Sequence, residues 1–333
     1  MKKRALAGAA IAAALLLTGC SGGSSGSGDA GGDVDSDAGA AALEQTSVTL
    51  GLVPVADFVT AYIAQDEGYF ADEGLEVKME VMQNAAAIVP GVMNGQVHFG
   101  TAAISPLISA SEQGLPVVIV ANAADVPLAV EDDPTAILVK PDPGIASPKD
   151  LEGKVVAVNA LQAAVELVVS QSVENDGGDP SEVTYVAMPF PDMAAALERG
   201  DIDAAGVIEP FRSSGLAAGF VSIASPFHEV LVPGKSHAVY FSSKQFIAEA
   251  PNTVAAFDRA LRRASETANE NPELVREMLQ KYGNLPAEVT ERINLPGYSP
   301  EPSSEAIERY ISVMEAQGFI APGAVTPADI LPQ

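Results

Sequence analysis

Apolar residues along this chain follow two alternating patterns, and the alternation predicts its secondary structure. Short apolar runs predict strands in the first part of the chain, at 48–53, 76–81, 97–100 and 117–121. Between them, apolar residues recur at helical spacing and predict helices at 58–70, 85–93 and 106–113. Strands that alternate with helices of this length are typical of parallel βαβ units, whose sheet is covered on both faces.

The same rhythm restarts after Pro134. The later apolar runs predict strands at 136–139, 155–158, 183–186, 204–208, 220–223 and 237–241, with helices at 163–174 and 192–199. From residue 245 onward the pattern is mostly amphipathic helix, and helices can begin at Pro251, Pro272, Pro286 and Pro302. The patterns predict an α/β protein with two α/β units and a helical C-terminal tail.

The first twenty residues are typical of an export signal. Three basic residues precede an uncharged run at 5–17, which is shorter than the roughly 20 apolar residues that span a bilayer. The run ends in Leu17-Thr18-Gly19-Cys20, which resembles the bacterial lipobox. This resemblance implies cleavage before Cys20 and a diacylglycerol lipid on its sulfur; the alternative is a secreted protein with a chance cysteine. Residues 21–46 are expected to form a flexible linker, because Ser, Gly, Asp and Ala dominate there.

The strong negative charge of the chain argues against two classes of partner, nucleic acids and anionic membrane surfaces. The chain has 18 Lys and Arg against 44 Asp and Glu, a net charge of −26. A strongly acidic protein is repelled by nucleic acid and by anionic lipid head groups. We therefore expect no nucleic-acid partner, and membrane attachment only through a lipid on Cys20. Acidity as an ordinary solubility trait is an equally good interpretation. Cys20 is the only cysteine, so no intrachain disulfide is expected. We also expect the protein to be a monomer.

Six passages, in order, resemble one family of transport proteins. The first is AQDEGYFADEGLEV at 64–77, and the others lie at 93–100, 147–158, 194–204, 209–210 and 246–273. Together they resemble the nitrate, sulfonate, taurine and thiamine-precursor binding proteins of ABC importers. The resemblance implies the periplasmic binding protein type II-like fold, in which two lobes enclose a ligand cleft. Lobe 1 would comprise residues 47–134 and 235–333, and lobe 2 residues 135–234.

Ligands of such folds bind where strands end and helices begin. On that basis four loops, at 54–57, 101–105, 159–162 and 209–212, are expected to line the cleft, together with one residue after the strand at 117–121. The candidate ligand-binding residues are Pro54, Asp57, Thr101, Ala102, Ser105, Asn122, Asn159, Leu161, Gln162, Glu209 and Arg212.

Several candidates have an ordinary structural alternative. Thr101 and Ser105 either contact ligand or cap a helix. Asp57 either faces the cleft or caps the helix predicted at 58, and we favour the cap. Asn159 bonds either the ligand or its own turn.

The two charged residues after the strand at 204–208 also have alternatives. Glu209 is either a cleft acid, which we favour, or a hinge residue. Arg212 either grips a ligand anion or is a solvated side chain, and we favour the second.

These residues favour a neutral or amine-bearing ligand, such as a pyrimidine-like vitamin precursor. Asp57 and Glu209 would repel an anion, and the 159–162 loop offers amides and apolar carbons. The alternative is an anionic solute: an aliphatic sulfonate, taurine, nitrate or an aromatic carboxylate. Aromatic stacking would fall to four residues that we expect in the core: Phe58, Tyr62, Phe190 and Phe211.

Enzymatic motifs are missing from the sequence. His98, His228 and His237 show no metal-ligand spacing, and there is neither a Gly-rich phosphate loop nor a G-x-S-x-G elbow. His98 stands where the family has Asp, and we interpret it as structural. The related thiamine-pyrimidine synthases depend on His and Cys residues that this chain lacks.

We therefore predict no catalysis, no cofactor and no metal. The predicted function is that of the lipid-anchored, extracytoplasmic solute-binding component of an ABC importer, with permease and ATPase subunits as partners. Two functions of other classes are the alternatives: a ligand-sensing lipoprotein and an enzyme that resembles the thiamine-pyrimidine synthases.

Overall fold

The computed structural model describes residues 42–141 and 144–332. The predicted signal peptide, the predicted lipid site at Cys20 and most of the predicted linker lie outside these residues. For them the sequence-based expectations stay predictions.

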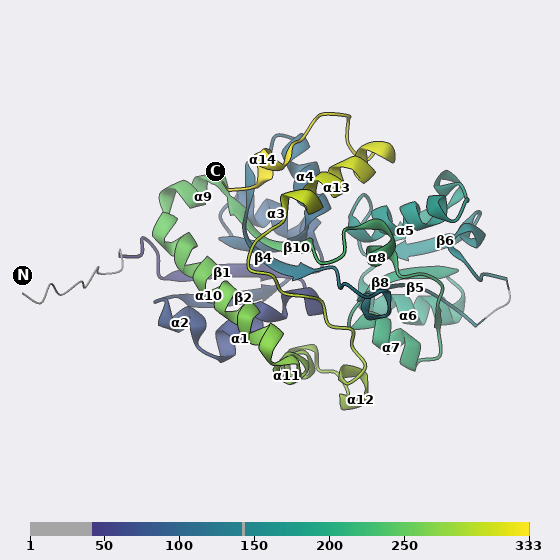
Figure 1. Cartoon of the computed structure of the whole chain (residues 1–333), viewed down its shortest axis with the longest axis horizontal. Coiled ribbons are helices and arrows are strands. Elements are labelled where there is room, and N and C mark those ends of the chain that lie inside the picture. The colour runs from purple at the N-terminus through teal and green to yellow at the C-terminus, as the bar shows by residue number, and fades with distance from the viewer. Residues whose placement is uncertain (1–41, 142–143, 333) are drawn as a thin grey trace, which may run out of the picture. The chain divides into compact units, whose positions relative to one another are not determined.

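The first sheet has five strands in the order β2-β1-β3-β10-β4. Figure 1 labels β1, β2, β4 and β10. These strands are β1 (Ser47–Leu52), β2 (Glu76–Val81), β3 (Phe99–Ala103), β4 (Val117–Asp125) and β10 (Ser236–Ser243). β1 pairs in parallel with β2 and β3. β10 runs antiparallel between β3 and β4, and all eight of its residues are buried. The chain thus returns to this sheet after it has built the second one.

The second sheet has five strands in the order β7-β6-β8-β5-β9. They are β5 (Thr135–Val139), β6 (Val155–Val158), β7 (Thr184–Ala187), β8 (Ala204–Ile208) and β9 (Val221–Ser222). β6 pairs in parallel with β7 and β8, whereas β5 is antiparallel to β8. The predicted α/β class is confirmed, but each sheet contains antiparallel pairs that the alternation of strands and helices did not predict.

Helices follow the strands in both halves of the chain. Those associated with the first sheet are α1 (Val59–Asp66), α2 (Tyr69–Asp72), α3 (Ala85–Met93) and α4 (Ile104–Glu112). Those of the second are α5 (Ala164–Asn175), α6 (Phe190–Arg199), α7 (Phe211–Ala217) and α8 (Pro226–Val230). The helix predicted at 58–70 is divided, because Gly68 adopts a left-handed φ of 77° that ends one helical segment before the next begins.

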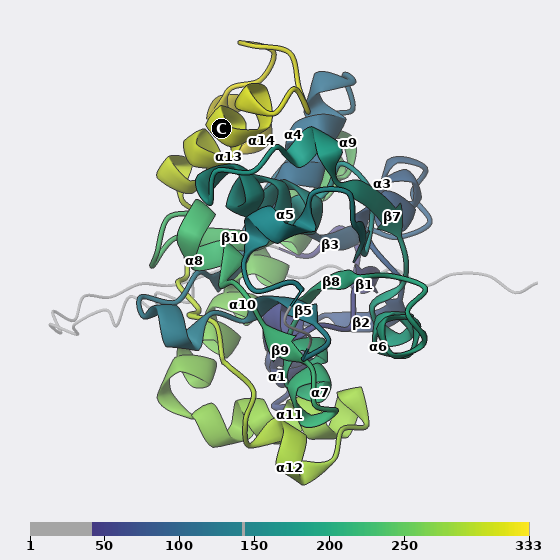
Figure 2. The ribbon, with the colours of Figure 1, turned by 90° about the vertical axis from the view of Figure 1, so that its right-hand side faces the viewer.

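The predicted helical tail is confirmed. It comprises α9 (Lys244–Glu249), α10 (Pro251–Glu270), α11 (Pro272–Gly283), α12 (Ala287–Thr290), α13 (Ser304–Ala316) and α14 (Pro327–Ile330). α10 packs against α1 and α2, while α13 packs against both α4 and α5. Figure 2 shows α13 and α14 near α4 and α5, with α11 and α12 at the opposite end beside α7. Among the described helices, none combines the length and the apolar character that crossing a bilayer requires.

Two strands are longer than predicted, and the extra residues matter for the site. The strand predicted at 97–100 runs from Phe99 to Ala103, and the one predicted at 117–121 continues to Asp125. Both extensions are paired with β10, which is more than 100 residues away in sequence. A local apolar pattern carries no information about pairing with a distant strand. The ends predicted from it therefore lie too early in the chain for both strands.

Candidate functional site

A cavity of about 360 Å³ lies where strands of both sheets end, a size that suits a small-molecule ligand. The first sheet contributes Val53, Val55 and the end of β3, and the second contributes Ile208 and the loop after β6. Most of the wall is apolar, and it includes Phe58, Phe190 and Phe227. The arrangement matches the rule that ligands of open α/β sheets bind at the carboxyl ends of strands.

The polar part of the wall is small and carries no basic side chain other than a histidine. Its polar residues are Asp57, Asn84, Ser109, Gln113, Asn159, Gln162 and His237. Among the described residues that line the cavity, none is a lysine or an arginine. The wall therefore offers an anionic ligand no fixed positive charge.

Asp57 and His237 form a buried pair in this wall. Asp57 lies in a short 3-10 helix, Ala56–Phe58, and His237 is the second residue of β10. Asp57 Oδ1 and His237 Nε2 are 3.6 Å apart, beyond hydrogen-bonding distance. Both side chains are almost completely buried, and neither of these atoms has a hydrogen-bond partner in the described structure.

Burial makes both groups uncharged at neutral pH. Burial, reinforced by the negative charges of Asp133 and Glu209, raises the pKa of Asp57 to about 8. Burial also lowers the pKa of His237 to about 3. The contact between them is therefore not an ion pair, and the pair presents two neutral polar groups to the cavity.

The favoured interpretation of Asp57 as a helix cap is wrong. The N-cap of α1 is Phe58, and no side chain bonds the first turn. The 3-10 segment inserts one further turn before α1, which moves Asp57 away from the capping position and into the cavity wall.

The loop after β6 reaches the cavity as expected. Asn159, Leu161 and Gln162 line it, together with Ala102 from the end of β3. Asn159 Oδ1 has no hydrogen-bond partner in the described structure, so it does not bond its own turn. The backbone carbonyl of Asn159 accepts a hydrogen bond of 3.3 Å from Asn84 Nδ2, which joins the two sides of the cavity. The ligand contacts of these residues stay predictions.

Thr101 and Ser105 lie outside the cavity lining. Thr101 is inside β3, where its hydroxyl accepts a hydrogen bond of 3.0 Å from the backbone N–H of Val53. Ser105 is the second residue of α4, whose N-cap is Ala103. Neither residue caps a helix, so that alternative is wrong for both; the longer β3 is the reason.

Asn122 and Pro54 also lie outside it. Asn122 is inside β4, and its Nδ2 donates to Asp125 Oδ1 at 3.0 Å and to the Ser299 carbonyl at 2.9 Å. Pro54 is exposed and borders a separate, small hollow beside Tyr62.

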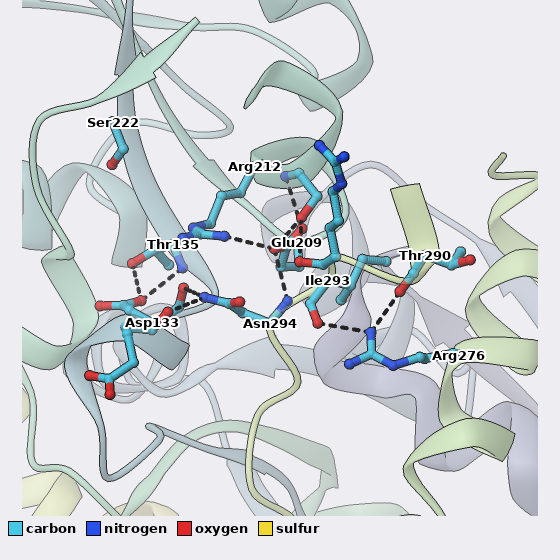
Figure 3. Close-up of polar contacts among 12 residues, drawn as sticks. Asp133, Thr135, Glu209, Arg212, Ser222, Arg276, Thr290, Ile293 and Asn294 are labelled. Atoms are coloured by element: carbon cyan, nitrogen blue, oxygen red, sulfur yellow. Dashed lines mark hydrogen bonds and ion pairs between the residues drawn. The ribbon is translucent and has the colours of Figure 1, made fainter. Parts of the chain in front are cut away.

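Glu209 and Arg212 bond each other and not the cavity. The Glu209 carboxylate is fully buried and accepts hydrogen bonds from Ser213 N at 3.0 Å, Ser213 Oγ at 2.8 Å and Asn294 N at 3.1 Å. Arg212 Nη1 lies 3.3 Å from Glu209 Oε1, and Figure 3 shows the guanidinium turned toward that carboxylate. The Arg212 side chain is only 17% exposed, so its interpretation as a solvated side chain is wrong.

The same cluster ties the C-terminal segment to the connection between the sheets. Asn294 Nδ2 donates to the carbonyls of Glu131 at 2.7 Å and Asp133 at 3.0 Å (Figure 3). The Asp133 carboxylate accepts from Thr135 N at 2.8 Å at the start of β5. Burial raises the pKa of both Asp133 and Glu209. These contacts place the Glu209 carboxylate beside the connection between the sheets and outside the cavity lining, and the hinge alternative for Glu209 stays a prediction.

Sequence reasoning missed part of the wall. Phe58 and Phe190 are buried in the core as expected, but they also line the cavity, and Asn84, Phe227 and His237 were not candidates. Asn84 was open to prediction, because it directly precedes a predicted helix and caps it by accepting from Ala87 N. His237 was not, because it reaches the cavity only through the antiparallel return of β10.

His98 has the structural role expected of it. Its Nδ1 accepts a hydrogen bond of 2.9 Å from the backbone N–H of Thr49, and its ring packs 5.0 Å from that of Phe246. Burial lowers its pKa. The described residues contain no group of three or more His, Cys, Asp or Glu placed to hold a metal ion.

Two α/β sheets with a mostly apolar cavity at their strand ends define the chain as a protein with the solute-binding fold of periplasmic binding proteins. The chain belongs to the NMT1/THI5-like family, whose profile matches residues 55–292. The predicted family and fold class are confirmed.

Comparison with known proteins gives relatives of two kinds. The formylaminopyrimidine-binding protein of Halalkalibacterium halodurans is 27% identical over 235 residues, which are 70% of this chain and 68% of the relative. The 4-amino-5-hydroxymethyl-2-methylpyrimidine phosphate synthase of Aspergillus parasiticus is 24% identical over 223 residues, 63% of each protein. About a third of each relative's length thus lies outside the alignment.

A solved structure shows the same fold. The alkanesulfonate-binding protein SsuA from Xanthomonas axonopodis pv. citri, bound to MOPS, superposes with a TM-score of 0.75 at 17% sequence identity. The superposition covers 87% of this chain and 99% of that protein. At this identity the match shows the common architecture alone.

Proposed function

We propose that this protein is the extracytoplasmic solute-binding component of an ABC importer. It captures a small organic molecule in the cavity between the two sheets and delivers it to a membrane permease and its ATPase subunit. The observation that carries the proposal is the position of the cavity, at the strand ends of both sheets, where a ligand touches both halves of the protein. Membership in a family that includes binding proteins supports it.

We infer that the ligand is neutral or carries an amine. The described cavity wall has no lysine or arginine, and its one acid is Asp57. The candidate cation Arg212 is paired with Glu209 and lies outside the lining. A sulfonate, nitrate or carboxylate would lose its hydration without gaining an ion pair, which disfavours the anionic alternative.

Binding without chemical turnover fits this wall better than catalysis. Asp57 and His237 are the only titratable side chains among the described lining residues, and no thiol or lysine nucleophile stands beside them. Because some relatives are pyrimidine phosphate synthases, the experiment must also test whether this protein converts its ligand into a product.

We also propose how the protein is held and divided. A lipid on Cys20 and the linker at 21–46 would tether a monomer to the outer face of the cell membrane. The lobes would comprise 47–134 with 235–333, and 135–234. The strand memberships of the two sheets, 47–125 with 236–243 and 135–222, support this division.

A ligand screen with an uptake assay tests the function. The purified protein is screened by thermal shift against amino-pyrimidines, flavins, amines, sulfonates, nitrate and aromatic acids, and any compound that protects is then incubated with it and analysed for products. We expect saturable protection, following RT ln(1 + [L]/Kd), and no product.

Cells that lack the gene should also fail to take up the protecting compound. If no compound of any class protects the protein, the proposed function is wrong. Protection with product formation would indicate a synthase, and protection with normal uptake in the deletion strain would indicate a sensor.

A further inference from the structure

We propose that Asp57 and His237 are the specificity-determining residues of the cavity, and that they select a flat apolar ligand that places a nitrogen-borne cation between them and carries no anionic group. This inference rests on the proposed function and names the ligand class of the same site.

The first argument is the cost of the pair. A buried polar atom without a hydrogen bond is unfavourable, and native proteins rarely retain one without a reason. Asp57 Oδ1 and His237 Nε2 both lack a hydrogen-bond partner. They are 3.6 Å apart, so a single ligand atom can lie within hydrogen-bonding distance of both. Other buried atoms lack partners too. The hydroxyls of Tyr298 and Tyr310 belong to residues that do not line the cavity, whereas Asn159 Oδ1 lies in the cavity wall and is a third polar atom without a partner there. A ligand can therefore satisfy the pair directly.

The second argument is the sign of the surrounding charge. Asp133 and Glu209 both act on Asp57, and both are negative charges that raise the pKa of its carboxyl. The positive charge of Arg212 is shared between Glu209 and Asp133 and is not among the influences on Asp57. A cation placed at Asp57 is attracted by all three acids, and it lowers the pKa of Asp57 so that the carboxyl becomes charged. An anion is repelled there.

The third argument is the shape and chemistry of the remaining wall. Phe58, Phe190 and Phe227 line the cavity, and the Phe227 ring lies 4.6 Å from the imidazole of His237. Aromatic side chains bury flat apolar surfaces and attract cations that lie over their faces. The wall thus suits a ring whose cationic edge points to the polar pair.

Three probes of nearly equal shape separate charge from size: benzamidine, a cation; benzamide, which is neutral; and benzoate, an anion. The purified protein is dialysed free of co-purified small molecules, and each probe is titrated by calorimetry. We expect benzamidine to bind at least about tenfold more tightly than benzoate, with benzamide between them. Because Asp57 must lose its proton to pair with the cation, benzamidine binding at pH 7 should also release protons, which titrations in buffers of different ionisation enthalpy measure.

Isosteric variants test the residues. Asp57→Asn should weaken benzamidine binding about tenfold, abolish the proton release and change benzamide binding by less than about threefold. His237→Phe should also weaken benzamidine binding. The matched control is Asp201→Asn, which removes an exposed carboxylate paired only with Arg199 and should change nothing. Asp57→Leu is the second variant if Asp57→Asn does not fold.

The outcomes separate this inference from the proposed function. Benzoate binding as tight as that of benzamidine, or unchanged benzamidine binding by Asp57→Asn, would overturn the inference while the importer function stands. Failure of all three probes to bind would also overturn it, since the cavity has room for each. The proposed function is tested by a different result: it is wrong if no compound in the wider screen protects the protein.

Discussion

Asp57 is the residue whose role departs most from its ordinary interpretation. An aspartate just before a predicted helix is usually a cap, worth about 1 kcal/mol to its helix. Here the carboxyl instead lies among other acids, without a hydrogen bond to Oδ1, in the wall of the cavity. A group held in this way lowers the stability of the folded protein, a common cost of a functional site.

The pH dependence of stability should reveal this cost. In the unfolded chain Asp57 has its ordinary pKa of 3.8, whereas burial in the folded protein raises this pKa to about 8. The folded state therefore binds the extra proton, and Asp57 makes stability fall as pH rises through this window. His237 has the opposite effect, but only between about 3 and its unfolded value of 6.5. Above pH 6.5 His237 no longer opposes this effect, and Asp57 should contribute a fall of up to about 1.4 kcal/mol per pH unit.

Urea unfolding at pH 6.5, 7.0, 7.5 and 8.0 measures this slope. Asp57→Asn should flatten it and should be more stable than the wild type at pH 8. Asp133 and Glu209 remain in both proteins, so the difference between the two curves isolates Asp57. Tyr240, Tyr298 and Tyr310, which also face Asp57, have pKa values raised by burial and do not titrate in this range. Equal slopes in the two proteins would show that Asp57 is ionised throughout.

At the residue scale, sequence reasoning found part of the cavity wall. Asp57, Ala102 and Asn159 follow or end predicted strands, and a strand end is visible in a local pattern. His237 is not visible in this way, because it is the second residue of a strand that runs antiparallel to β3. Arg212 was assigned wrongly although its partner, Glu209, lies only three residues earlier, because the burial of this pair depends on packing that the local sequence does not contain.

At the scale of elements, two side-chain contacts link the part of the protein built on the first sheet to the part built on the second. The cap residue of α3, Asn84, donates to the carbonyl of Asn159 after β6. On another side, Gln317 at the end of α13 donates to Gln171 Oε1 of α5 at 3.0 Å. Both contacts link an element packed on the first sheet to one of the second, so both should favour the closed arrangement around a ligand.

Removal of the Asn84 contact should speed ligand release. Asn84→Ser keeps an oxygen that can cap α3 but is too short to reach the Asn159 carbonyl. The loss of one hydrogen bond of about 1 kcal/mol should raise the dissociation rate roughly fivefold, with little change in the association rate. Stopped-flow displacement of the tightest ligand from the screen gives both rates.

Asn271→Ser is the matched control, because Asn271 also caps a helix, α11, by accepting from Leu274 N. It should leave ligand release unchanged. Equal release rates for wild type and Asn84→Ser would mean that the Asn84 contact does not hold the ligand-bound state.

Secondary structure was predicted well where it depends on local pattern and poorly where it depends on pairing. The alternation of strands and helices gave the order of elements, and Pro251 and Pro272 begin α10 and α11 as predicted. The ends of β3 and β4 were wrong because β10 extends both. Those two errors also displaced Thr101, Ser105 and Asn122 from loops, where we expected them, into regular structure.

On the scale of the whole molecule, the cluster around Glu209 joins three distant parts of the chain. It connects the segment from the end of β8 to the start of α7 with the C-terminal segment at Asn294, which in turn bonds the connection into β5. The backbone N–H of Ala56, from the cavity wall of the first sheet, also donates to the Glu209 carbonyl at 3.1 Å. The residue is placed where the two sheets meet.

Loss of the Glu209 carboxylate should destabilise the whole protein. Glu209→Ala leaves Arg212 without its anion and the donors of Ser213 and Asn294 without an acceptor, which should cost about 3–5 kcal/mol of unfolding free energy. Urea unfolding measures the loss. Glu209→Gln, which keeps an acceptor, should lose less, and Glu198→Ala, at the exposed end of α6, should lose almost nothing. A loss below about 1 kcal/mol for Glu209→Ala would contradict the role of the cluster.

The position of β10 has a consequence for the order in which the chain can be completed during synthesis. β1 to β4 emerge first, but β3 and β4 do not touch each other; each pairs with β10, which follows only after all strands of the second sheet. Until residue 243 has emerged, β3 and β4 each keep open the edge that β10 later covers, and open strand edges can recruit other chains. The second sheet can close on its own earlier. A nascent chain of this protein is therefore most prone to aggregate in the interval between the end of β9 and the arrival of β10.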